Sequence, residues 1–191
     1  MKMAYWDLET HDLSPSFGPL ICASVLLLPS EEMITFRMDT YIKRKLATDM
    51  TDDRQLCIDL RDLLEDQHIT CGYFSKGFDI THLRTRLAMH GERILEKMLH
   101  MDPIWYFKGW RGLRTMSSKM KHVAAFLHAA GQDIELKPDV LPETWMIARQ
   151  GNKKALDEVC DRCESDVRIT RIINEYTMDK NQRTVANISK Y

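Results

Sequence analysis

The chain has 191 residues, 44% of them hydrophobic and 29% charged, with 27 Lys+Arg against 28 Asp+Glu. This balance excludes collagen-like, low-complexity and disordered chains. The length supports one sizeable core and no stretch resembles a linker, so we expect a single domain over residues 1–191. The five cysteines are scattered through apolar segments, which favours reduced core thiols over a secreted disulfide framework.

The hydrophobic segments predict a cytoplasmic protein with no membrane association. The longest strongly apolar run, residues 20–28, stops at Pro29. It is less than half of the roughly 20 residues that a membrane helix needs, so we expect a buried strand there. The N-terminus reaches acidic residues before any hydrophobic stretch, unlike a secretory signal or a transit peptide.

Strands dominate the beginning of the predicted fold. Residues 4–10 and 20–28 are predicted strands, and the alternating residues 33–38 favour a third strand in an antiparallel meander. The polar stretch 39–53 is expected to be a loop. Leucines at helical spacing follow, and residues 69–74 are predicted to form a short apolar strand.

Helices alternate with short strands in the rest of the chain. A helix is predicted from Asp79 to about Gly91, a natural C-terminal stop. Residues 100–107 are interpreted as a fifth strand or an irregular edge. Further helices are predicted over 117–130, 142–150 and 153–178. This order of elements predicts an α/β fold built on a mixed sheet.

Charge is distributed unevenly along the chain. Residues 79–121 carry nine Lys/Arg against four Asp/Glu, whereas residues 1–78 carry eight against 13. A basic segment can face phosphates, and concentrated carboxylates can hold cations.

Two carboxylates share one side of the first predicted strand. Residues two apart in a strand point the same way, so Asp7 and Glu9 project together while Trp6 and Leu8 face the opposite side. Adjacent like charges on a central strand are costly unless a cation lies between them. The pair therefore indicates a metal site, with a solvent-facing acidic strand face as the alternative.

Two further acids have informative positions. Asp79 opens a helix after an apolar strand, where an N-terminal role favoured by the helix dipole is the alternative to metal binding. Asp166 lies on the apolar face of the last helix, and we expect no cation three or four residues away on that face. A metal ion would compensate the negative charge of Asp166. Cys160 and Cys163 lack further ligands and are expected to be core residues.

In order and context, these motifs resemble those of the DEDD 3′–5′ exonucleases of the RNase H-like fold. The resemblance rests on Asp-x-Glu in a first strand, Phe-Asp at a strand-to-helix junction and Cys-Glu-Ser-Asp-Val at residues 163–167, and it covers nearly the whole chain. It implies a five-stranded mixed sheet with helices on both faces. It also implies two divalent cations, Mg²⁺ or Mn²⁺, held by Asp7, Glu9, Asp79 and Asp166.

The resemblance assigns a role to each acid. Asp7 would bridge both ions, Glu9 and Asp166 would hold the ion that activates water, and Asp79 would act through waters of the second ion. The implied activity is two-metal-ion hydrolysis of phosphodiester bonds at a single-stranded or frayed 3′ end of nucleic acid. A structure-selective endonuclease and a catalytically silent nucleic-acid-binding module are the alternatives. Whether the substrate is DNA or RNA is left open.

The sequence departs from the family pattern at four positions. Arg162 and Asp161 stand where the family places a Tyr or His general base, and neither is a ready base. We therefore expect water to be activated by the cations alone or by a His from a mobile loop, while Arg162 also supports the silent alternative. Phe74 replaces a common Asn and Thr81 a common Pro, so substrate contacts are expected to differ.

The predicted substrate contacts lie near the acids and in the segment 105–114. This segment interleaves aromatic and basic residues, which stack bases and follow phosphates without reading sequence. Core packing is the alternative for its aromatic side chains. The predicted substrate-binding residues are Thr10, His11, Phe74, Lys76, His82, Trp105, Trp110, Arg111 and Arg114.

Overall fold

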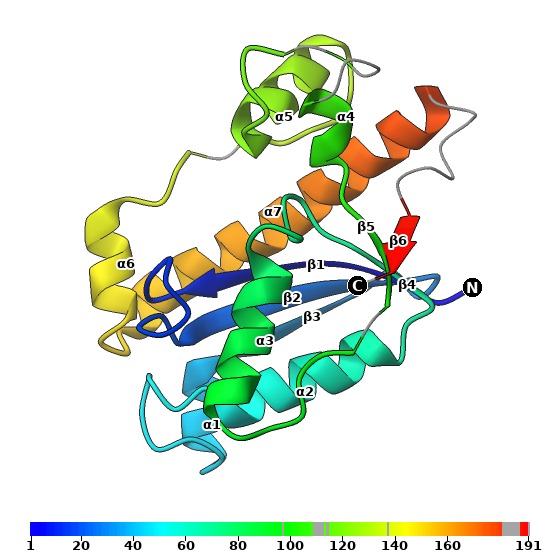
Figure 1. The fold of residues 1–191 in the computed structure, drawn as a ribbon. Coiled ribbons are helices and arrows are strands. Elements are labelled where there is room, and N and C mark those ends of the chain that lie inside the picture. The colour runs from blue at the N-terminus through cyan, green and yellow to red at the C-terminus, as the bar shows by residue number, and fades with distance from the viewer. Residues whose placement is uncertain (97, 109–112, 114, 137, 181–187, 191) are drawn as a thin grey trace.

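The computed structural model describes residues 1–96, 98–108, 113, 115–136, 138–180 and 188–190. A mixed sheet of six strands, in the order β3-β2-β1-β4-β5-β6, forms its centre (Figure 1). The strands are β1 (Met3–Thr10), β2 (Leu20–Leu28), β3 (Glu32–Arg37), β4 (Ile69–Cys71), β5 (Leu99–Met101) and β6 (Ile188–Lys190). The first three form the expected antiparallel meander, and β4 and β5 run parallel to β1. The five expected strands are present, and β6 adds an unexpected sixth beside β5.

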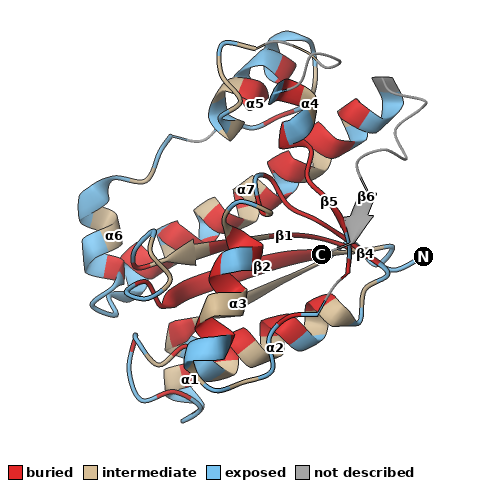
Figure 2. Ribbon diagram, in the orientation of Figure 1, coloured by how far each residue is buried: buried red, intermediate tan, exposed pale blue. Residues whose placement is uncertain are grey.

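The helices cover both faces of this sheet. They are α1 (Met38–Lys43), α2 (Arg54–Glu65), α3 (Asp79–Met89), α4 (Ile104–Lys108), α5 (Met120–Ala129), α6 (Pro142–Ala148) and α7 (Lys153–Lys180). The long helix α7 packs on β1, β2 and β3, and α2 and α3 pack together on the other side (Figure 1). Figure 2 shows buried residues along the central strands and the length of α7. In the described part of the chain, no helix has the length and apolar character needed to cross a membrane.

The alternation along β1 divides its side chains between the two faces. Trp6 and Leu8 are buried in the main core together with side chains of α2 and α3. On the opposite face, the Tyr5 hydroxyl accepts a hydrogen bond from Asn174 of α7, with 3.1 Å between oxygen and nitrogen. Asp7 and Glu9 share the parity of Tyr5 and therefore lie on the α7 side.

Two expectations from the sequence are corrected. The stretch expected to be a loop begins with α1, because Met38 and Tyr41 are buried against the core and their packing stabilises a short helix. The segment 100–107, interpreted as a fifth strand or an irregular edge, is a strand only to Met101 and then turns into α4. Asp102 accepts a hydrogen bond from the Ile104 backbone N–H at 3.3 Å, and Pro103 precedes the helix, which together form a helix start.

A buried ion pair joins the start of α2 to α3, and both of its members hold backbone groups of the segment between β1 and β2. The Asp53 carboxylate is fully buried and accepts two hydrogen bonds from Arg86, at 2.9 Å from Nε and 2.7 Å from Nη2. The same carboxylate accepts the Leu20 backbone N–H at 2.8 Å. Arg86 also donates to the Pro15 carbonyl at 3.2 Å. The inner face of α3 therefore fixes the segment that follows the acidic strand.

The C-terminal half of β1 has one open edge. β2 pairs with β1 along its length, with a register shift between Glu9 and Thr10. On the other side, β4 pairs with β1 only over Met3–Tyr5. Backbone amides beyond Tyr5 are therefore available on that edge to side chains from α3.

Candidate metal centre

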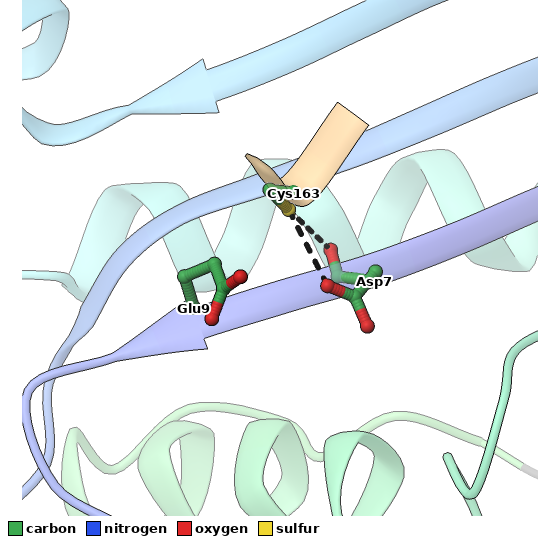
Figure 3. A group of neighbouring side chains, drawn as sticks. All are labelled: Asp7, Glu9 and Cys163. Carbon is green, nitrogen blue, oxygen red and sulfur yellow. Dashed lines mark hydrogen bonds between the residues drawn. The ribbon is translucent and has the colours of Figure 1, made fainter. Parts of the chain in front are cut away.

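The centre of the site is formed by Asp7 and Glu9, which lie beside Cys163 of α7 (Figure 3). One ligand atom from each of the three residues lies within 4.8 Å of the other two. The Cys163 thiol is 3.6 Å from Asp7 Oδ2 and 3.5 Å from the Asp7 carbonyl oxygen. The two carboxylates project together, as the strand parity predicts, and they are partly covered by α7. Cys163 is a buried free thiol, as expected of a core residue.

Asp79 approaches this pair from the open edge of β1. It is the first residue of α3 and only 3% exposed. Its carboxylate accepts hydrogen bonds from the Leu8 backbone N–H and from its own. Burial raises the pKa of Asp79 from 3.8 to about 7, with Asp102 adding to the rise. Asp79 therefore both opens helix α3 and lies beside the other acids. These two roles are alternatives in the sequence analysis.

Asp166 has a cationic partner that the sequence analysis excludes. Arg162, one helical turn earlier on α7, donates from Nε to Asp166 Oδ2 at 3.0 Å. The expectation of no nearby cation is wrong because the long arginine side chain reaches across from the adjacent part of the helix surface. The other carboxylate oxygen, Oδ1, is buried and has no hydrogen-bond partner among the described residues. Asp161 is exposed, as expected.

The four acids influence one another electrostatically. Burial raises the pKa of Asp7 well above its usual value, and Cys163, Asp79, Glu9 and Asp166 raise it further. Burial likewise raises the pKa of Glu9, reinforced by Asp166 and Asp79. Burial also raises the pKa of Asp166, against the opposing effect of Arg162. The cluster thus gathers more negative charge than the nearby guanidinium compensates.

The donor set of the cluster fits divalent cations. Its carboxylate oxygens are hard ligands of the kind that Mg²⁺ and Mn²⁺ prefer. Asp166 Oδ1, which has no partner in the described part of the chain, and the raised pKa values of the acids indicate a site that would gain from added positive charge. Asp7, Glu9, Asp79 and Asp166 are the residues that could hold such ions.

One carboxylate that the sequence analysis missed fixes the turn before Asp79. Asp102 is 1% exposed and accepts hydrogen bonds from the backbone N–H of Phe74 at 2.9 Å and of Lys76 at 3.2 Å. The parallel pairing of β4 with β5 brings Asp102 beside this turn. Its only local signal is the Asp-Pro sequence at the start of α4, because the contact with the turn spans 26 to 28 residues.

The same turn presents an aromatic ring to solvent. Phe74 has a φ of 58°, which is uncommon for a residue with a side chain, and is 43% exposed. Lys108 Nζ lies 4.6 Å from the centre of the Phe74 ring and 5.4 Å from the centre of the Trp105 ring. We call Phe74, Trp105 and Lys108 the aromatic surface. Lys76, also predicted to bind substrate, is partly exposed on the Phe74 turn.

Gly77 leaves room for the Phe74 ring. A Cβ atom at Gly77 would lie 2.5 Å from two carbons of that ring. Only a residue without a side chain allows this close approach, which helps to hold an exposed aromatic group in place.

A cavity of about 280 Å³ borders Glu9. Glu9, Thr10, His11, Phe78, Trp145 and Arg149 are among its lining residues. The His11 ring accepts a hydrogen bond from Arg149 Nε at 3.4 Å, and burial together with Arg149 lowers its pKa to about 4. Thr10 and His11 therefore lie next to the acidic cluster, as predicted.

The remaining predicted substrate contacts have other locations. His82 is 1% exposed, and its Nε2 lies 2.6 Å from the Gly18 carbonyl oxygen, so it supports the loop after β1 and has no surface to offer a substrate. Trp105 is 52% exposed, unlike the core residue of the alternative interpretation. Trp110, Arg111 and Arg114 lie outside the described residues.

Comparison with known proteins identifies the class. The sequence model of the RNase H superfamily matches residues 4–178, and the chain therefore belongs to that superfamily. The RNase H-like fold expected from the motifs is thus confirmed. No curated protein matches the sequence.

A solved structure shares this fold. The family B DNA polymerase from the hyperthermophilic archaeon Pyrobaculum calidifontis is similar over 93% of this chain, with a TM-score of 0.71 and 15% sequence identity. The match covers 24% of the polymerase chain, so this chain spans about a quarter of that protein's length. At this identity the likeness concerns the fold.

Proposed function

We propose that this chain is a metal-dependent 3′–5′ exonuclease acting on single-stranded or frayed nucleic acid. The observation that carries the proposal is the cluster of Asp7, Glu9, Asp79 and Asp166, whose raised pKa values and unpartnered Asp166 oxygen suit two divalent cations. Membership of the RNase H superfamily supports a nuclease-type activity. RNase H-like nucleases generally use divalent metal ions.

The chain supplies a preorganised set of ligands. Asp7, Glu9, Asp79 and Asp166 would hold divalent cations, whose charge would polarise the phosphodiester and the attacking water. Asp7 and Glu9 are fixed by a central strand, and the Leu8 backbone N–H orients Asp79. Asp166 offers an oxygen that no protein group occupies among the described residues. Rigid placement of this kind lowers the cost of organising charge at the moment of reaction.

The histidines nearest the acids have other hydrogen-bond partners. His11 is engaged by Arg149, and His82 by the Gly18 carbonyl. Arg162, at the place of the family's Tyr base, is not a ready base because a guanidinium is a hydrogen-bond donor only. His11 Nε2 is buried and has no hydrogen-bond partner among the described residues, but the pKa of His11, lowered to about 4 by burial and Arg149, makes it a weak base. Of the two expectations for activating water, this favours the cations alone over a histidine base.

The surroundings of the cluster suit an extended single strand. The cavity beside Glu9 has the concave form that could receive a terminal nucleotide. On the other side of the acids, the aromatic surface offers exposed rings on which a base can stack, with Lys108 near the phosphates. We infer that the terminal nucleotide occupies the cavity and a neighbouring base contacts Phe74.

The test is cleavage of 5′-labelled single-stranded DNA and RNA with Mg²⁺, Mn²⁺ or EDTA. We expect a ladder of shortened products with either metal ion and none with EDTA. Asp7→Asn should abolish the ladder, while Asp66→Asn, a control at an exposed carboxylate paired with Lys2, should preserve it.

Two other results would contradict the proposal. Cleavage of circular single strands would identify an endonuclease. Retained binding without cleavage in any metal would identify the silent nucleic-acid-binding module, which the Arg162–Asp166 ion pair favours.

A further inference from the structure

Arg162 lies between two acidic partners. Its Nε is 3.0 Å from Asp166 Oδ2, and its Nη1 is 3.9 Å from Asp139 Oδ1. Asp166 belongs to the acidic cluster, whereas the Asp139 side chain is 62% exposed and also accepts Lys121 Nζ at 2.8 Å. The guanidinium therefore has a partner inside the cluster and another at its hydrated border.

The charge of Arg162 acts on more than one member of the cluster. Burial is the main cause of the raised pKa of Glu9 and of Asp166, and Arg162 opposes the rise at both. Within the cluster, the positive charge of the guanidinium thus partly compensates the negative charge of Glu9 and Asp166. A divalent ion bound on that side would have to share these carboxylates with a fixed positive charge.

The structure also provides space for Arg162 to move. A cavity of about 270 Å³ borders its side chain, and Lys121, Asp139 and Ile169 are among the other lining residues. Asp139, the second partner of the guanidinium, lines the same cavity as Arg162, so a rotation into this space would be directed toward Asp139. The surroundings of Arg162 therefore offer a second acidic partner and adjacent space.

We propose that Arg162 is a resident cation of the metal centre, which neutralises the Glu9–Asp166 side and moves toward Asp139 when a divalent ion binds there. This inference rests on the proposed function for the presence of divalent ions. As a consequence, the cluster binds one divalent ion readily and the second weakly. Even at the dielectric constant of water, removing a positive charge from the vicinity of a divalent ion changes affinity about tenfold.

The same helix offers a matched control. Arg168 pairs with Glu164, four residues earlier, at 3.0 Å, and its side chain is 53% exposed. This pair has the same four-residue spacing as the pair of Arg162 with Asp166. Its acid, Glu164, does not belong to the acidic cluster. Arg168→Gln therefore removes the same charge from the same helix without touching the metal centre.

The experiment is a calorimetric titration of the full chain with Mn²⁺ at pH 8. For the wild-type chain we expect a tight and a weak binding event. Arg162→Gln should strengthen the weak event by about tenfold or more. Arg168→Gln should leave both events unchanged, and Asp7→Asn should abolish the tight one.

A second variant tests the movement of Arg162 at an exposed position, where the fold is not at risk. Asp139→Asn removes the alternative partner of the guanidinium and should weaken the second event further. Unchanged Mn²⁺ affinity in both Arg162→Gln and Asp139→Asn overturns the inference but preserves the proposed metal centre. If the wild-type chain binds no Mn²⁺, the proposed function and this inference both fail.

Discussion

Replacing Asp79 by Asn removes one of four clustered carboxylates while keeping a side chain of nearly the same shape. Because the pKa of Asp79 rises from 3.8 to about 7 on folding, the folded chain keeps this proton to a higher pH than the unfolded chain does. The free energy of unfolding therefore falls as the pH rises from about 4 to about 7. Asn cannot ionise, so the free energy of unfolding of the variant does not fall with pH for this reason.

The magnitude follows from the shift in pKa. Each pKa unit corresponds to about 1.4 kcal/mol, and the difference between the two values amounts to about 4 kcal/mol. Asp79 is only 3% exposed, so solvent screens this energy little. Above pH 7 and without metal ions, we expect Asp79→Asn to be more stable than the wild type by up to about 4 kcal/mol.

Urea denaturation in EDTA between pH 4.5 and pH 8.5 measures this difference. The two proteins should have similar stability at the acidic end and diverge as the pH increases. Saturating Mn²⁺ should then stabilise the wild type more than the variant, because a ligand of the folded state adds to stability. A variant that is less stable at pH 8, or a difference that does not change with pH, would refute the reasoning.

Three further predictions concern the aromatic surface and the buried ion pair. Phe74→Ala should weaken binding of single-stranded DNA by about 5- to 100-fold through lost stacking, measured by fluorescence anisotropy, whereas Phe126→Ala, an exposed ring on α5, should not. Gly77→Ala displaces the Phe74 ring and should reduce the same binding, while urea denaturation shows a change in stability below about 1 kcal/mol. Asp53→Asn leaves the buried Arg86 without its charged partner and should lower the free energy of unfolding by about 3 kcal/mol or more. A wild-type urea midpoint for Asp53→Asn would contradict a stabilising role.

Local periodicity is sufficient for the central features of the site. Strand parity places Asp7 and Glu9 on the same face of β1, and the helical pattern places Asp166 on the apolar face of α7. The contact of Asp79 with Leu8 depends on where β4 stops pairing with β1, which no local pattern encodes. The ion pair of Arg162 with Asp166 follows from their four-residue spacing in a helix. The expectation of no nearby cation excludes it because that expectation considers only the residues on the apolar face of that helix.

Contacts between distant segments explain the remaining differences. Asp102 holds the Phe74 turn only because β4 and β5 run side by side. The strand β6 is three residues long and exists through its pairing with β5, so its own sequence is too short to predict it. Phe74 and Trp105 are predicted to bind substrate for separate reasons, and in the fold Lys108 lies close to both rings.

The segment from Phe74 to Asp79 has a consequence for engineering. Only four residues separate Phe74, whose ring is proposed to contact substrate, from Asp79, whose carboxylate is proposed to hold metal. Asp102 fixes the beginning of that segment through backbone N–H groups. The distance between the Phe74 ring and the Asp79 carboxylate is therefore set by the length of this segment. An insertion here would shift one relative to the other even if every side chain were kept, so reporter peptides and affinity tags belong in other loops.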